Sequence, residues 1–407
     1  MELRIDLASD DLDRFRGHST LKAFKRGRPR NRIERSESRH LNCSVYELGG
    51  GAWSAEMEIC HGEQDGAPVC FATFRLTEGP SAPLCALLQA MAEAVPFSVN
   101  PDISRPTKPV KAKPPLLHRA MEADEAFRLI AASAISHLSV NGDYLKRTGD
   151  PEAVHQMRVG LRRLRAAMTM FKPLLGDPVS QSLRVELRWL QQTLGAARDW
   201  DVLLADTVAP LEELFGSTPG YHKLCALIDH RRQEARNGAL KELAMPRLTR
   251  LMLQLTFWCE GAGSGQPLSD APIADLARSI LQKRYRKIRK TMPLLNELSP
   301  EERHRCRIEI KKLRYAVDFF SSLFPAKRAQ RLMQLLASMQ DKLGALNDVA
   351  TASDKIGKLV IEEKSADMAW AAGQLLGWHT ARSPDLLSQV HDHWAAAEKL
   401  QAFWRES

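Results

Sequence analysis

The chain carries the same basic pattern twice, 149 residues apart. Residues 155–165 read His-Gln-Met-Arg-Val-Gly-Leu-Arg-Arg-Leu-Arg, and residues 304–314 read His-Arg-Cys-Arg-Ile-Glu-Ile-Lys-Lys-Leu-Arg. The same offset relates Leu194-Gly195 to Leu343-Gly344, and Asp199 to Asp348. A period near 150 residues is too long for a solenoid repeat. The pattern therefore predicts a duplicated domain in which each copy has kept a basic helix.

Each repeated segment has an apolar seam beside a basic stripe. In the first copy Val154, Met157, Leu161 and Leu164 recur at spacings of three and four, which is typical of a helix packed in a bundle. The neighbouring stripe has spacings of three, four and three, so its side chains share one helix face over about 15 Å. The two stripes are His155, Arg158, Arg162 and Arg165, and His304, Arg307, Lys311 and Arg314, flanked by Arg163 and Lys312.

The composition of the stripes favours an anionic ligand over a simple solvated surface. Residues 155–165 contain no acid, and residues 304–314 contain only Glu309. Like charges four residues apart on a helix repel by a few tenths of a kcal/mol, so the pattern does not serve helix stability. Arginine matches phosphate oxygens bidentately and lysine adds a mobile charge. We therefore expect both stripes to line a groove that binds a polyanion.

Several residues near the stripes have two open interpretations. Each stripe histidine either holds its helix through a hydrogen bond or donates to phosphate. Asp199 and Asp348 are expected to support the stripe by orienting a basic side chain, or to cap a helix. One carboxylate per copy makes a weak metal site, and no metal is expected. Further cations either extend the groove or are solvated, and extension is slightly favoured: Arg184, Arg188, Lys283, Arg286, Lys287 and Lys290.

Composition limits the remaining possibilities. The net charge is +9, and +8 of it lies after residue 115, in the duplicated region. Seven scattered cysteines without a CxxC pair suggest neither a disulfide framework nor a zinc site. The sequence shows no nucleophile beside either stripe histidine, no phosphate-binding glycine loop and no apolar span of membrane length. We expect no catalytic residue, no cofactor and a cytoplasmic location, and the oligomeric state stays open.

The chain divides into four segments in sequence order. Residues 1–100 have short alternating runs at 2–7, 43–46, 55–59 and 69–75, which read as strands, and a helix near 84–95. Residues 101–116 are rich in proline and predict a stiff linker. Residues 117–260 and 268–407 are helical in pattern, separated by a glycine-rich break, and each is long enough for a four-helix bundle. The predicted fold class is mainly α, preceded by a small α+β domain of mostly antiparallel strands.

The aromatic residues argue against binding of single-stranded nucleic acid. Binding sites of that kind interleave exposed stacking rings with basic residues. Here the tryptophans fall at core-like helical positions, away from the stripes: Trp189, Trp258, Trp370, Trp378 and Trp404. Nucleic acid is therefore a possible partner, but a less favoured one.

From about residue 117 to the end, the chain resembles the CHAD domain, a helical domain named for its histidines. The resemblance rests on Val154-His155 through Arg165, on residues 194–202 (Leu-Gly-Ala-Ala-Arg-Asp-Trp-Asp-Val), and on His304 through Arg314-Tyr315. It implies two four-helix bundles related by a pseudo-twofold. It also implies a basic surface that binds inorganic polyphosphate, and association with polyphosphate granules. The residues that it marks for binding are the two stripes with Arg163 and Lys312.

Residues 1–112 resemble a reduced version of the CYTH domain, the triphosphate tunnel fold. Glu2-Leu3-Arg4 matches the end of its E-x-E-x-K strand, without the first acid and with arginine in place of lysine, and Glu56 and Glu58 match a later acidic strand. A triphosphatase needs several carboxylates for metal and several cations for phosphate, and the sequence does not assemble that set. We therefore predict non-catalytic polyphosphate binding. The alternatives are a metal-dependent triphosphatase in the N-terminal region and non-specific nucleic-acid binding.

Overall fold

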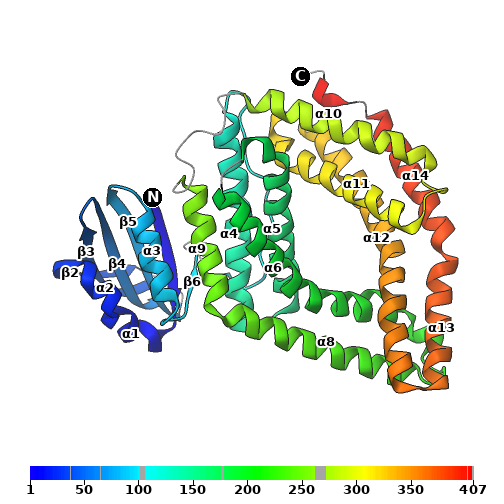
Figure 1. Cartoon of the computed structure of the whole chain (residues 1–407), viewed down its shortest axis with the longest axis horizontal. Helices are drawn as coiled ribbons and strands as arrows, with labels where there is room; N and C mark the ends of the chain where they lie inside the picture. The colour runs from blue at the N-terminus through cyan, green and yellow to red at the C-terminus, as the bar shows by residue number, and fades with distance from the viewer. Residues whose placement is uncertain are drawn as a thin grey trace. The chain divides into compact units, whose positions relative to one another are not determined.

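The computed structural model describes residues 1–36, 38–64, 66–100, 106–175, 178–261, 272–400 and 402–405. Packing divides the chain into two units built from non-consecutive segments (Figure 1). The first unit comprises Met1–Lys113, Arg128–Leu194 and Leu240–Leu268, and the second comprises Pro114–Phe127, Gly195–Ala239 and Ser269–Ser407. The boundaries predicted in sequence order stay a prediction. Pro101 and the glycine-rich break after residue 261 lie outside the described residues.

The N-terminal part of the first unit is an antiparallel sheet with three helices. Its strands lie in the order β2-β3-β4-β5-β1-β6. The strands are β1 (Glu2–Leu7), β2 (Lys25–Ser36), β3 (Arg39–Gly50), β4 (Trp53–Gln64), β5 (Ala67–Glu78) and β6 (Phe97–Val99), and the helices are α1 (Leu12–Gly17), α2 (Ser19–Phe24) and α3 (Ala82–Ala92). The four predicted strands and the predicted helix are all present. Strand β2 was not predicted, because six of its residues are basic and its sequence lacks apolar alternation. It lies at the edge of the sheet with both faces largely exposed, so its fold does not require that alternation.

The two faces of the sheet differ in chemistry. Leu3, Ile5, Met57 and Phe74 are fully buried on one face, where Phe15 of α1 packs edge-on against Phe74 with ring centroids 6.5 Å apart. The opposite face carries acids and arginines in alternating register across β1, β2, β4 and β5. One face therefore builds the core, and the other presents charge.

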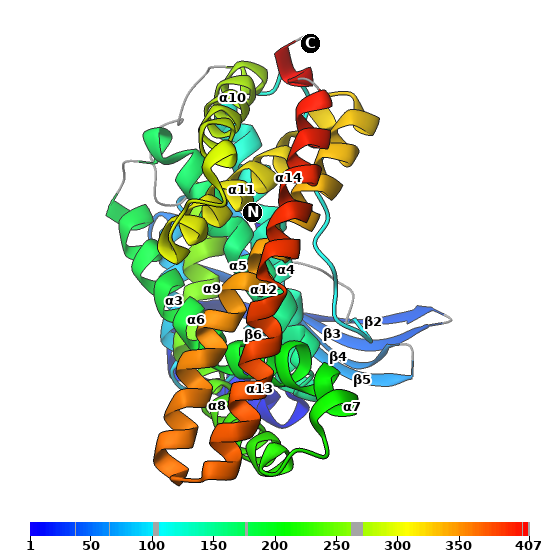
Figure 2. The same ribbon diagram turned by 90° about the vertical axis from the view of Figure 1, so that its right-hand side faces the viewer.

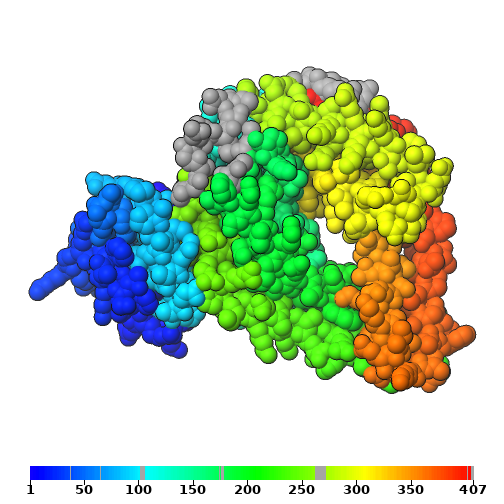
Figure 3. Space-filling model, in the orientation of Figure 1, coloured from blue at the N-terminus to red at the C-terminus, as the bar shows by residue number. Residues whose placement is uncertain are grey.

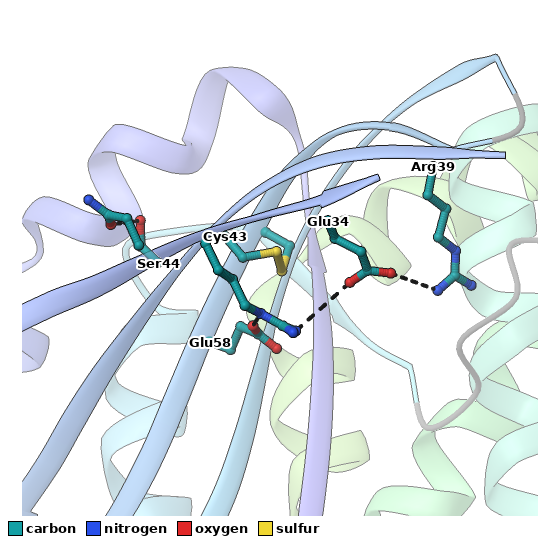
Figure 4. The surroundings of a disulfide bond; sticks show 8 residues. Glu34, Arg39, Cys43, Ser44 and Glu58 are labelled. Carbon is teal, nitrogen blue, oxygen red and sulfur yellow. Dashed lines mark hydrogen bonds and ion pairs between the residues drawn. A yellow bond between two sulfur atoms is a disulfide. The ribbon is translucent and has the colours of Figure 1, made fainter. Parts of the chain in front are cut away.

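The cysteine prediction needs a correction, because Cys43 and Cys60 form a disulfide. The two residues lie directly opposite each other on β3 and β4. Cross-strand neighbours bring their side chains together whatever their separation in sequence, and counting cysteines does not reveal that pairing. Figure 4 shows the bond beside Glu58, with Glu34 and Arg39 joined by an ion pair further along the sheet.

The sheet and the segment that follows it are bound to helices of the same unit. The hydroxyl of Thr249 on α9 (Pro246–Cys259) donates to the Phe97 carbonyl at 2.9 Å, and the space-filling view shows the N-terminal lobe in contact with this helix (Figure 3). Residues 106–113 belong to neither a helix nor a strand. They are also fixed along α4 (Ala123–Thr148), since the Asn141 amide donates to the Val110 carbonyl and accepts from its N–H, both at 3.0 Å.

The rest of the described chain is helical, which confirms the mainly α fold class. None of its helices combines the length and apolarity needed to cross a bilayer, within the part of the chain that the structure describes. Besides α4 and α9, the helices are α5 (Pro151–Met170), α6 (Pro178–Val202), α7 (Glu212–Phe215), α8 (Tyr221–Ala244), α10 (Ile273–Thr291), α11 (Pro300–Phe320), α12 (Ala326–Glu363), α13 (Ala366–Ala381) and α14 (Ser383–Lys399).

In the second unit, α12 is a long helix that both α13 and α14 pack against (Figure 2). Leu203, Ile228, Ile356 and Leu375 belong to one buried cluster of this unit, drawn from four separate segments. The expectation that Trp370 is a core residue was wrong, since 63% of it is exposed. Its helix α13 has so many small and apolar residues that periodicity alone does not mark the buried face.

Candidate anion-binding surfaces

Helix α5 holds the first stripe in a defined orientation within the first unit. Asp150 caps its start by accepting the N–H of Glu152 at 2.8 Å. Gly160 lets α5 approach α4 closely, because a Cβ there would lie 3.1 Å from the backbone nitrogen of Leu138. With that side of α5 buried, His155, Arg158, Arg162 and Arg165 are left partly exposed.

Three arginines from two helices gather at the end of the first stripe. Burial lowers the pKa of Arg165, and the positive charges of Arg188 and Arg184 on α6 lower it further. The guanidinium of Arg184 donates to the Met168 carbonyl at 2.7 Å, which fixes it beside α5. These contacts bring the predicted extension residues of α6 together with the stripe. Cations held this close in a partly buried setting are suited to binding an anion.

Arg163 does not share the exposed face, although the motif includes it. It is only 5% exposed and donates to the Lys113 carbonyl at 3.2 Å, on the segment that precedes α4. Its position, one residue beyond Arg162, rotates it toward the interior by about 100°. The structure therefore assigns Arg163 a contact that fixes the chain, which sequence spacing alone did not reveal.

Helix α11 carries the second stripe in the second unit. Its start has a complete capping box, in which Ser299 and Glu302 satisfy each other's backbone N–H groups. His304 is exposed, and its Nδ1 lies 2.7 Å from Oδ1 of Asn347, in the repeated segment of α12. This contact orients the ring. Because the contact uses Nδ1 alone, it does not exclude donation to phosphate from Nε2, and both interpretations of this histidine stay open.

The repeated Gly and Asp of α12, Gly344 and Asp348, lie beside Arg307. A Cβ on Gly344 would lie 3.2 Å from Nη2 of Arg307, so the glycine makes room for the guanidinium. Burial raises the pKa of Asp348, while the nearby positive charges of Arg307 and Lys311 act in the opposite direction. Arg307, Gly344 and Asp348 line a cavity of about 300 Å³, together with His379. Asp348 therefore lies near two cations of the second stripe, and its supporting role stays a prediction.

Asp199, the matching residue of the first copy, has a different neighbour. It is exposed, and its charge acts on Lys355 of α12, whose pKa is lowered by burial and raised in part by Asp199. Both residues belong to the second unit. The repeated acid thus lies near a cation in each copy, but the cation beside Asp199 is outside the predicted set.

The cations predicted to extend the second stripe fall into two groups. Lys283, Arg286 and Lys290 are exposed on α10. Lys287 is exposed as well, but it contacts Glu309 on α11 at 2.9 Å, and Lys312 contacts the same carboxylate at 2.7 Å. Lys312 is therefore a member of an ion-pair cluster as well as a neighbour of the stripe.

The acids expected in the N-terminal region are held by arginines. Arg32 binds Glu58 at 2.6 Å, Arg30 binds Glu56 at 3.2 Å, and Arg75 binds Glu2 at 3.4 Å. Among the described residues, the one group of three or more side chains close enough to share a metal is Cys43, Glu58 and Cys60. Its two sulfur atoms are joined in the disulfide and are not thiolate ligands in this state.

Comparison with known proteins decides the family. The family model of the CHAD domain matches residues 129–356, more than half of the chain. The chain belongs to the CHAD family. It is similar to the crystal structure of the CHAD domain from the plant Ricinus communis, with a TM-score of 0.64 and 33% identity over 72% of this chain and 98% of that one. The resemblance to the CHAD domain seen in the sequence is thus confirmed.

A second structure shows the same fold at lower identity. PptA from Streptomyces chartreusis has a TM-score of 0.54 and 19% identity, and the match covers 68% of this chain and all of that one. No curated protein matches the chain. The CHAD match includes both α5 and α11, and so contains both stripes. The N-terminal sheet lies outside it, and its likeness to the CYTH domain stays a prediction.

Proposed function

We propose that this CHAD protein binds inorganic polyphosphate without catalysis, through the basic surfaces of α5 and α11, at polyphosphate granules. The observation that carries the proposal is the arginine cluster of the first unit. Arg184 is held beside α5 by its hydrogen bond to the Met168 carbonyl. Burial lowers the pKa of Arg165, and the positive charges of Arg188 and Arg184 lower it further. Such crowding is unfavourable in the free protein, and a dense polyanion relieves it. The matching stripe on α11 supplies a second basic surface with Arg307 oriented by its neighbours.

Binding is best tested by titrating labelled long-chain polyphosphate against the purified protein at about 0.05 and 0.2 M salt. Affinity carried by phosphate contacts falls steeply over this range, by analogy with DNA. Duplex DNA and tripolyphosphate serve as competitors. Weak displacement by DNA supports a polyphosphate protein. Equal competition by DNA would mean a general polyanion surface and would contradict the proposed ligand.

The site is tested by the double charge reversal Arg158→Glu with Arg307→Glu, one change in each stripe. We expect loss of binding with an unchanged circular dichroism spectrum. The matched control is Arg35→Glu with Lys399→Glu, which changes the net charge equally at two exposed positions outside the stripes. Full binding by the folded stripe variant, or equal loss in the control, would place the ligand elsewhere.

A second candidate function is favoured by the charged face of the sheet. Glu2, Arg4, Glu56 and Glu58 share that face, as a phosphohydrolase of the CYTH type would require. The ion pairs of Glu2, Glu56 and Glu58 with arginine compete with metal binding. Phosphate release from tripolyphosphate with magnesium or manganese, lost in Glu56→Gln with Glu58→Gln, would establish this activity.

A further inference from the structure

One buried carboxylate in the second unit forms ion pairs with three cations. Glu309 on α11 is 7% exposed. Its oxygens lie 2.7 Å from Nζ of Lys312, 2.9 Å from Nζ of Lys287 and 3.3 Å from Nη1 of Arg284. Burial acts to raise the pKa of Glu309, but the hydrogen bonds from Lys312 and Lys287 outweigh it and lower the pKa. Glu309 is therefore ionised at neutral pH, and the cluster of four has a net charge of +2.

The first copy has no such acid at the matching position. The offset of 149 residues aligns Glu309 with Gly160. Gly160 allows close packing of α5 on α4, and it offers no charge to the arginines nearby. The acid at position 309 is therefore a property of the second stripe alone. The helical repeat does not require it.

The cations on Glu309 are partly accessible, whereas the carboxylate is covered. The side chain of Lys287 is 61% exposed and that of Lys312 is 33% exposed, against 10% for Glu309. A carboxylate offers the same kind of charged oxygen acceptor as a phosphate. Glu309 thus occupies donors that an external polyanion would otherwise use, on the same helix as Arg307 and Lys311.

We propose that Glu309 is a built-in counter-anion that weakens polyanion binding by the α11 surface. By partly neutralising Lys287, Lys312 and Arg284, it lowers the affinity of the α11 surface for a polyanion. This inference rests on the proposed polyphosphate function and deepens it, because it identifies a residue that sets affinity.

The direct test is Glu309→Gln in the full chain, titrated with long-chain polyphosphate at about 0.05 and 0.2 M salt. We expect an affinity gain of about fivefold at the lower salt, the contribution of one lysine or arginine at an anionic surface. The slope of log affinity against log salt should steepen by about 0.7–0.9, as for one added phosphate contact. Unchanged or weaker binding by the folded variant would overturn the proposal.

A lysine pair on α10 provides a second test, and its arm in the wild-type background does not depend on how Glu309→Gln folds. Lys287 contacts Glu309, whereas Lys290 is exposed three residues on. In the wild-type background Lys287→Met should cost less than about twofold in affinity, and Lys290→Met about fivefold. In the Glu309→Gln background the two losses should become equal. An equal loss in the wild type would show that Glu309 does not neutralise Lys287.

The two proposals fail in different ways. If wild-type protein does not bind polyphosphate, the proposed function is wrong. If the wild type binds, and the reversal of Arg158 and Arg307 abolishes binding, the function stands. In that case only the behaviour of Glu309→Gln and Lys287→Met decides whether Glu309 acts as a counter-anion.

Discussion

A Cβ atom on Gly344 would lie 3.2 Å from the Nη2 atom of Arg307. The missing side chain on α12 thus provides the space in which a stripe arginine of α11 rests. Since the neighbour is the flexible end of a side chain, a small substitution can be accommodated by moving Arg307 rather than the backbone.

Gly344→Ala should therefore weaken polyphosphate binding without destabilising the fold. Alanine is more favourable than glycine within a helix by about 1 kcal/mol, so thermal stability should hold or rise while Arg307 is displaced. The control is Gly357→Ala on the same helix, where a Cβ meets no atom within 4 Å. That variant should gain stability with unchanged affinity. Equal affinity in both variants would show that the position of Arg307 does not matter.

Gly160→Ala should have the opposite effect on stability. Its Cβ would meet the backbone of α4, at 3.1 Å from the nitrogen of Leu138 and 3.3 Å from the oxygen of Ala134. Backbone atoms of a packed helix cannot move away cheaply, and overpacking of this kind costs about 1–3 kcal/mol. Denaturant unfolding measures the loss. A variant as stable as the wild type would show that α4 and α5 are less closely packed.

Arg188→Gln should stabilise the free protein and weaken its binding at the same time. The substitution removes one of two positive charges that act on Arg165. We expect a stability gain of a few tenths of a kcal/mol at about 0.05 M salt. The gain should vanish near 1 M salt, where the screening length is about 3 Å. Thermal unfolding at both salts checks this, and a gain that persists at high salt would point to packing instead.

Asp348→Asn tests the acid beside Arg307 by its pH dependence. Burial raises the pKa of Asp348 in the folded protein above its ordinary value of 3.8. The folded state thus binds this proton more tightly than the unfolded state. The protonated carboxyl therefore contributes to the free energy of unfolding at low pH, and that contribution is lost as pH rises through the folded pKa. The asparagine variant should be more stable than the wild type at pH 7. Below pH 3.8 the two should converge, and a constant difference in melting temperature would contradict the assignment.

Much of the architecture could be predicted from local patterns. Period-two alternation located β1, β3, β4 and β5, and spacings of three and four located α5 and α11, because one face of each element is buried. Strand β2 and the exposure of Trp370 were missed. Strand β2 has no buried face that would produce alternation. Trp370 lies on α13, where small and apolar residues occur on every face of the helix, so the pattern does not show which face is buried.

The candidate site was predictable in composition but not in detail. The repeat identified both stripes, since charge without counter-charge is visible in sequence. It did not show that Arg163 turns inward to the Lys113 carbonyl, or that Lys287 and Lys312 converge on Glu309. The contacts of Arg163 and Lys287 join residues from separate segments, and Lys312 meets Glu309 about one turn earlier on the same helix.

The sequence by itself determined the duplication, the helical class and the identity of the basic residues, because these follow from periodicity and local charge. Only the tertiary structure decided which cations stay available to a ligand. That outcome depends on what neighbouring helices bring close to each cation: a glycine beside Arg307, a second and third arginine near Arg165, and a carboxylate 2.9 Å from Lys287. Ion pairs and close packing require atoms to lie within a few ångströms of one another, and only the folded chain brings residues from different helices that close.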